Sequence, residues 1–140
     1  MAKMGYTAFF ILIFIIFIFF AASYEYVSMS DSDNTTTSTA ANRNAITQSI
    51  NWGNARVNEE ITINEDVAKE AVLRQYARDS NFADGDRYIN IHNISGTPPM
   101  IAVDAYTVVK TPYSNLYSDV PDNITRSRDV VIYEAKDEEK

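Results

Sequence analysis

The sequence predicts an α+β protein: an N-terminal transmembrane helix, followed by amphipathic helices packed on a small antiparallel sheet. Residues 6–23 (YTAFFILIFIIFIFFAAS) carry no charge and hold six of the chain's seven phenylalanines. Residues 40–79 place apolar side chains at helical spacing, whereas segments between residues 88 and 135 alternate them as strands do. Helices that precede the strands, rather than alternate with them, are typical of the α+β class.

The apolar run at residues 6–23 is long enough to cross a membrane. As a helix it spans about 27 Å, close to the roughly 30 Å hydrocarbon core of a bilayer. It is apolar on every side, whereas a soluble helix keeps a polar face. A buried core helix is one alternative, but a chain of 140 residues offers little protein to surround it. A cleaved signal peptide is another, with Ala21, Ala22 and Ser23 as its small-residue site. The length of the run and its lack of helix breakers favour a retained anchor.

The distribution of charge predicts an orientation. The net charge is −7, and Lys3 is the only charge before the apolar run, so the remainder carries 19 acidic and 11 basic side chains. A lysine before the run and acidic residues after it favour a cytoplasmic N-terminus and an extracytoplasmic C-terminal domain. The acidic balance argues against nucleic acid as a partner. Membrane lipid is the expected partner of the run.

Few residues in this chain carry catalytic or metal chemistry. There is no cysteine, which removes disulfides, thiolate ligands and cysteine nucleophiles, and His92 is the only histidine. A His-based triad or a site with several histidines is therefore not expected within one chain. We interpret His92 as an exposed strand residue. We expect no catalytic, cofactor-binding or metal site and no small-molecule substrate, so the predicted role is non-enzymatic.

Four segments divide the chain. Residues 1–5 are a short leader, residues 6–23 the transmembrane helix, residues 24–39 a polar tether, and residues 40–140 the extracytoplasmic domain. The tether is rich in Ser, Thr, Asp and Asn, which favour caps and turns over helix interiors. We expect it to be solvated, or to be a frayed continuation of the membrane helix. Its two aspartates, Asp31 and Asp33, are interpreted as solvated carboxylates, with a cation site as the alternative.

The first helix of the domain is expected at residues 40–58. Ile46, Ile50, Gly53 and Val57 fall on one face at spacings of four, three and four. Trp52 lies off this stripe. It either covers the edge of its own domain's core or contacts a partner.

A second helix is expected to end near Asp79. Its start is marked either by Thr62 and Glu65, which form a capping-box pattern, or by Asn64 as the N-cap. The predicted apolar stripe follows helical spacing, with two more side chains beside it: Ala68, Val72 and Tyr76, then Leu73 and Ala77.

Strands fill the remainder of the domain. After a turn at residues 79–86, whose Asp84-Gly85-Asp86 could alternatively hold a cation, residues 88–94 and 100–109 alternate and are expected to pair antiparallel. Residues 111–123 form a loop and residues 128–135 a last strand. The side chains expected to face the core are Ile89, Ile91, Ile101, Val103, Ala105 and Val109, with Leu116 and Val120 packing from the loop.

The start of the chain resembles a known processing site. Lys3-Met4-Gly5-Tyr6-Thr7 is similar to the site of type IV prepilins and pseudopilins, in which a membrane peptidase cuts after the glycine and the apolar helix stays on the mature protein. The resemblance implies a cut between Gly5 and Tyr6. The chain departs from the family at the fifth mature position, where most members have Glu and this sequence has Phe10.

The order of segments extends this resemblance along most of the chain. The anchor, the region at residues 42–70, the strand PPMIAVDAYTVVKT and the final short strand are similar to the TadE-like pseudopilins of tight-adherence pili. This implies a structural subunit of a surface pilus or secretion-type assembly, whose N-terminal helix packs against those of other subunits. The alternative is a single-pass, signal-anchored protein-binding domain unrelated to pili, with Trp52 as a possible contact.

Overall fold

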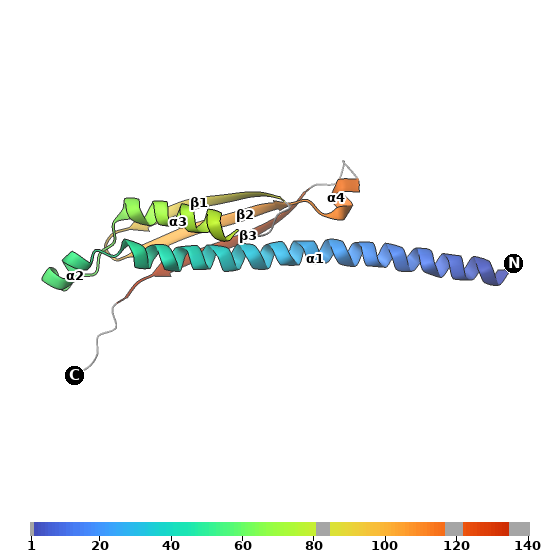
Figure 1. Cartoon of the computed structure of the whole chain (residues 1–140), viewed down its shortest axis with the longest axis horizontal. Coiled ribbons are helices and arrows are strands. Elements are labelled where there is room, and N and C mark those ends of the chain that lie inside the picture. The colour runs from blue at the N-terminus through green and yellow to red at the C-terminus, as the bar shows by residue number, and fades with distance from the viewer. Residues whose placement is uncertain (1, 81–84, 117–121, 135–140) are drawn as a thin grey trace, which may run out of the picture.

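The computed structural model describes residues 2–80, 85–116 and 122–134. Within them, two helices lie on one face of a three-stranded antiparallel sheet with the strand order β1-β2-β3 (Figure 1). The chain is α+β with a long apolar N-terminal helix, as the sequence predicts. Its elements in chain order are α1 Ala2–Ser49, α2 Trp52–Asn58, α3 Glu65–Asp79, β1 Asp86–Ser95, β2 Met100–Val109, α4 Pro112–Leu116 and β3 Asn123–Ile132.

Helix α1 runs unbroken through residues that the sequence divides among several segments. It has 48 residues, which at 1.5 Å per residue gives a length of about 72 Å. Its N-terminal half projects beyond the domain, and its C-terminal half lies along the sheet (Figure 1). Residues 24–39 are therefore not a solvated tether, but they do continue the N-terminal helix, as the alternative expectation has it. That segment is helical, and its polar side chains Ser30, Asn34, Thr37 and Ser38 are buried in the domain.

Helix α1 ends where the chain turns back toward α3. Asn51 caps α2, its side-chain oxygen accepting a hydrogen bond from the backbone N–H of Asn54 at 3.1 Å. Ile46 and Ile50 are buried, as their spacing predicts. Val57 is 80% exposed, because the break between α1 and α2 stops the predicted stripe from continuing.

Helix α3 begins at the second of the two predicted caps. The side-chain oxygen of Asn64 accepts from the backbone N–H groups of Asp66 and Val67 at 3.1 and 3.2 Å. The predicted Leu73 and Ala77 are exposed. The predicted stripe of Ala68, Val72 and Tyr76 is buried as expected. The side chains buried beside it are Ala71 and Gln75, on its other side, because α3 packs against both α1 and β1.

The sheet keeps the predicted pairing of its first two strands but differs in its third. Strands β1 and β2 are antiparallel, and Ile101 and Val103 face the helices as expected. Strand β3 begins at Asn123, five residues earlier than predicted, since its first half buries the polar Thr125 and Ser127 rather than apolar side chains. Leu116 is 68% exposed and does not pack into the core. Val120 and the centre of the turn at residues 79–86 lie outside the described residues.

The main core lies between the two helices and the sheet. Its largest fully buried side chain is that of Ile101 on β2. Helices and strands both contribute, so the core joins α1, α3 and the sheet into one body. Its buried members are Ala45, Ile46, Ile50, Ile63, Ala68, Ala71, Val72, Ile101 and Val103.

We expect Ile101→Ala to lower the free energy of unfolding by about 2–5 kcal/mol, because it leaves a cavity where the helices meet the sheet. Urea unfolding of the full chain in a mild detergent, followed by circular dichroism, measures the change. The exposed Val57→Ala is the control and should change stability by less than about 0.5 kcal/mol. Equal effects of the two substitutions would contradict this placement of the core.

Candidate functional site

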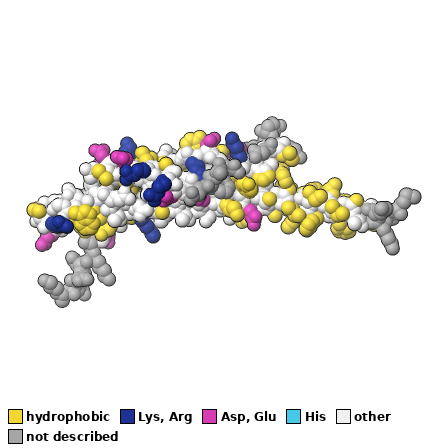
Figure 2. Space-filling view, viewed as in Figure 1, with side chains coloured by type: hydrophobic (Ala, Val, Ile, Leu, Met, Phe, Trp, Pro, Cys, Tyr) yellow, Lys and Arg dark blue, Asp and Glu magenta, His cyan; other side chains and the backbone are white. Residues whose placement is uncertain are grey.

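The projecting half of α1 presents an extended apolar surface. Phe10, Phe14 and Phe17 are 66%, 64% and 72% exposed, and Figure 2 shows hydrophobic side chains along this part of the helix. Among the described residues, α1 is the one helix long and apolar enough to cross a membrane; its most apolar window has a mean hydropathy of 2.6 and none of it is buried. This surface is compatible with a single-pass membrane protein.

The predicted processing site lies near the free end of this surface. Gly5 and Tyr6 are in the first turns of α1, and Tyr6 is largely exposed. A Cβ atom added at Gly5 would meet nothing within 4 Å. Glycine is therefore not required here by the packing of the fold, and a substitution at this position tests recognition by a peptidase rather than folding. Whether the bond is cut stays a prediction.

A series of polar side chains attaches the other half of α1 to the sheet. Ser30, Asn34, Ser38 and Asn42 recur every fourth residue, and we call them the polar ladder. The Ser30 and Ser38 hydroxyls lie 3.2 Å from those of Thr125 and Ser127, respectively. The Asn42 side-chain nitrogen donates to the Asp129 carboxylate at 2.9 Å.

From Asn34 to Asn42 the spacing of the polar ladder matches that of β3, where the successive partners are Thr125, Ser127 and Asp129. Four residues of helix advance about 6 Å, and two residues of antiparallel strand advance about 6.8 Å. Moving from Ser38 to Asn42 on the helix therefore corresponds to moving from Ser127 to Asp129 on the strand. This match fixes both the rotation and the height of α1 on the sheet.

Asn34 is the member of the polar ladder that joins the most elements. Its side-chain nitrogen donates to the backbone carbonyl oxygens of Ala105 on β2, at 3.2 Å, and Thr125 on β3, at 3.4 Å. Its side-chain oxygen accepts from the phenol of Tyr76 on α3 at 2.8 Å. Burial raises the pKa of the Tyr76 phenol, so the proton that makes this bond is retained. One fully buried amide thus holds α1, α3 and two strands together.

The two aspartates of residues 24–39 differ in their surroundings. Asp31 is exposed, whereas an oxygen of Asp33 lies 2.6 Å from a guanidinium nitrogen of Arg87 on β1. Asp33 is therefore an ion-pair partner that adds to the attachment of α1, rather than a solvated carboxylate. Asp84 of the alternative cation site lies outside the described residues. Among those that are described, no group of three His, Asp or Glu side chains is placed to hold a metal ion.

A charged cluster lies on the sheet face that points away from the helices. The Asp104 side chain is 1% exposed and accepts hydrogen bonds from the Arg126 guanidinium, with Nε at 2.9 and 3.0 Å from its two oxygens. Arg128 Nε lies 3.9 Å and His92 Nε2 3.6 Å from its oxygens. The hydrogen bonds from Arg126 hold the pKa of Asp104 below its ordinary value. A carboxylate held in its ionised form in this way is a poor proton acceptor, and its geometry suits a structural role.

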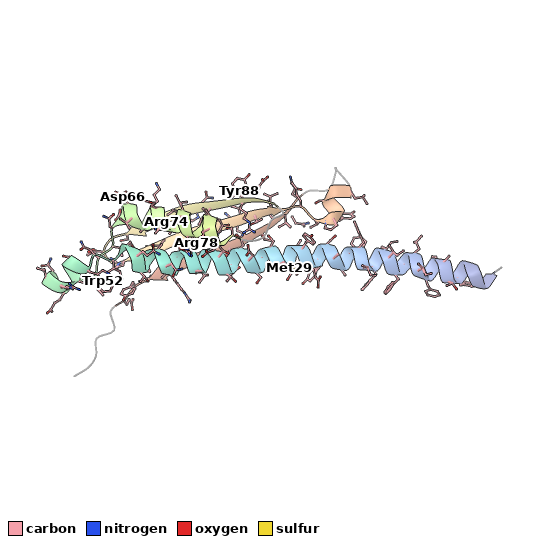
Figure 3. All side chains as sticks on the ribbon, in the orientation of Figure 1. Met29, Trp52, Asp66, Arg74, Arg78 and Tyr88 are labelled. Carbon is pink, nitrogen blue, oxygen red and sulfur yellow. The ribbon has the colours of Figure 1, made fainter. Side chains whose placement is uncertain are left out.

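The sequence also singled out His92 and Trp52. His92 lies at the rim of this cluster, and Trp52 lies away from it. His92 is an exposed strand residue, as predicted. Trp52, labelled in Figure 3, is 58% exposed on α2, at the opposite end of the domain from the projecting helix. It is not among the side chains that form the main core or pack against it. Contact with a partner stays a prediction.

Sequence reasoning missed the polar ladder, although a signal for it was present. Small polar side chains recur at positions 30, 34, 38 and 42, the spacing of one helix face. The pattern was hidden because the residues between them are also polar.

Comparisons with protein-family models, with curated proteins and with solved structures found no match to this chain.

We expect Tyr76→Phe to destabilise the fold by about 1–2 kcal/mol, because it leaves the buried oxygen of Asn34 without its donor. Combining it with Asn34→Ala in a double-mutant cycle should give a coupling energy of about 1 kcal/mol. Urea unfolding supplies the four free energies. Tyr88→Phe, on the outer face of the sheet, is the control and should show no coupling to Asn34→Ala; equal coupling for both tyrosines would contradict the assigned contact.

We expect Asp104→Asn to lower the midpoint of thermal unfolding, because the new amide cannot replace a carboxylate between two guanidinium groups. The folded-state pKa of Asp104 lies below its unfolded value of about 3.9. Its contribution is therefore present above about pH 4 and is lost as the pH falls through the folded-state pKa.

The difference between wild type and Asp104→Asn should accordingly shrink between about pH 7 and about pH 3. Circular dichroism melts at both values measure it. Asp122→Asn, at an exposed position, should match wild type at both. If the difference in unfolding midpoint between wild type and Asp104→Asn stays constant with pH, the charge of Asp104 does not contribute to stability.

Proposed function

We propose that this chain is a membrane-anchored, pilin-like structural subunit of a surface pilus or secretion-type assembly. The observation that carries the proposal is the division of α1 into two halves. One half is bonded to the sheet through the polar ladder. The other half, residues 6–23, is exposed, apolar and continuous with it, and we call it the apolar rod. Such a helix gives a subunit one surface for lipid before assembly and for neighbouring helices after it.

The apolar half needs a non-aqueous environment. Twelve large apolar side chains between Tyr6 and Phe20 are more than 40% exposed. At about 1.5–3 kcal/mol for each such side chain, leaving them in water costs on the order of 20 kcal/mol. Most small domains have less net stability than this. Lipid or the helices of other subunits therefore have to cover the surface.

The rigid link between the two halves supports a role in assembly. Helix α1 continues from the apolar rod into the domain without a break, and the polar ladder fixes its rotation on the sheet. When apolar helices of several copies pack together, the position of each domain follows from the position of its helix. With Phe10 at the place of the family's usual Glu, the rod also carries no charge that would oppose insertion into lipid.

The proposed orientation places the N-terminus in the cytoplasm and the domain outside. Lys3 precedes the apolar rod, and Glu25 and Asp31 follow it. Retention of the basic end on the cytoplasmic side agrees with the usual distribution of charge around single-pass helices.

An alternative function is a single-pass binding domain unrelated to pili. The exposed Trp52 favours it, since tryptophan is enriched where proteins contact partners. Both functions use the same anchor, and they differ in what happens at Gly5.

We expect native protein isolated from membranes to begin at Tyr6, and Gly5→Val to abolish this processing. The substitution meets no steric obstacle in the fold, so its effect would lie in recognition by the peptidase. Mass spectrometry of the N-terminal peptide measures the result. Ala8→Val, an equally exposed substitution three residues further on, is the control and should be processed as wild type.

Other start sites give different conclusions. A chain that begins at Met1 or Ala2 would refute pilin-type processing and support the single-pass binding domain. A chain that begins at Tyr24 would show removal of the apolar rod, and both membrane functions would then be wrong.

A further inference from the structure

Helix α4 forms a second contact between the domain and the apolar half of α1. It connects β2 to β3 at the end of the sheet nearest the projecting helix (Figure 1). We propose that α4 is a membrane-contacting foot, in which Leu116 and Tyr113 rest in the outer interface of the same bilayer that α1 crosses. The proposal rests on the proposed function in one respect, the insertion of residues 6–23 in a membrane.

Aromatic contacts place α4 against a defined level of α1. The ring centroid of Tyr113 lies 6.3 Å from that of Phe19, edge to face, and 5.6 Å from that of Phe20. Together with Leu116 and two isoleucines, these rings line an open apolar groove of about 350 Å³. Its lining residues are Ile15, Ile16, Phe19, Phe20, Tyr113 and Leu116.

The level of this contact corresponds to the membrane interface. Phe19 and Phe20 lie three to four residues before the end of the apolar run at Ser23, which is about 5–6 Å along the helix axis. A side chain held against them lies just inside the outer boundary of the hydrocarbon. Tyrosine is enriched at this depth because its ring is apolar and its hydroxyl reaches water.

Polar groups at the start of α4 are satisfied locally. The Thr111 backbone N–H donates to the Ser114 hydroxyl at 2.9 Å, and the Ser114 N–H donates to the Thr111 hydroxyl at 3.2 Å. These reciprocal bonds satisfy polar groups of the turn within the turn itself. Leu116 remains 68% exposed beside the apolar rod.

Lipid fits this surface better than any other occupant. The groove opens onto side chains of α1 that already lie within the proposed membrane span, so its apolar lining is continuous with the lipid-facing surface. An exposed leucine at this level gains an apolar environment from the bilayer without any second protein. The foot would set the distance of the domain from the membrane.

Fluorescence quenching in nanodiscs tests the proposal. The chain has no cysteine, so Leu116→Cys, Phe14→Cys and Val57→Cys each give one site for an environment-sensitive fluorophore. Discs holding one copy of the full chain are made from phosphatidylcholine, with and without lipids that carry a nitroxide quencher high on the acyl chain. We expect the labels at positions 14 and 116 to lose most of their emission and the label at position 57 to keep its own.

The outcomes separate the foot from the anchor. Quenching at position 14 but not at 116 would overturn the foot and leave the anchor intact. No quenching at either position would overturn both, because the span itself would be misplaced. Burial of the label at position 116 only in discs with two copies would assign the groove to a second chain and overturn lipid contact.

Adding Tyr113→Ser to Leu116→Cys should reduce quenching at position 116, while the same change with Phe14→Cys should leave quenching at position 14 unchanged.

Discussion

The attachment of α1 to the sheet through buried polar side chains is the constraint on which the rest of the structure depends. Asn34 bonds to β2, β3 and Tyr76 at once, and serines on either side of it meet hydroxyls on β3. Apolar contacts are non-directional and would allow the helix to slide or rotate. Hydrogen bonds with fixed partners specify one register, and an unmade bond at a buried site is costly. The position of the projecting half follows directly from this register.

Much of the fold could be predicted because its signals are local. The run at residues 6–23 is recognisable from composition alone, and the alternation around Ile101 and Val103 identifies a strand and the face that it buries. Asn64 was correctly considered as a cap for α3 because capping depends on residues two or three positions away. The outward direction of Asp104 also follows from alternation. Its contact with Arg126 does not, since that requires the pairing of β2 with β3.

The remainder could not be predicted because both sides of an interface are polar. Residues 24–39 resemble a tether, and the first half of β3 resembles a loop, as long as each is considered alone. Ser38 is buried because Ser127 lies opposite it, and Ser127 is buried for the same reason. Methods that depend on hydrophobic periodicity detect one apolar face at a time. They have no means of recognising two polar segments that satisfy each other. The predicted N-terminal helix therefore ends too early, and the predicted last strand begins too late.

The same interface explains why the apolar half of α1 can continue into a folded domain without a hinge. Polar side chains keep the C-terminal half of α1 from being apolar all round, so the apolar surface is confined to the N-terminal half. Beyond about Ser23, the helix carries the Ser, Thr and Asn side chains that suit a sheet with polar residues on β3. The change from an apolar to a polar surface is thus encoded in α1 itself, and Tyr113 of α4 contacts Phe19 and Phe20 within about one turn of this change. A helix anchored at both levels transmits any displacement of its apolar half to the domain as a rigid movement.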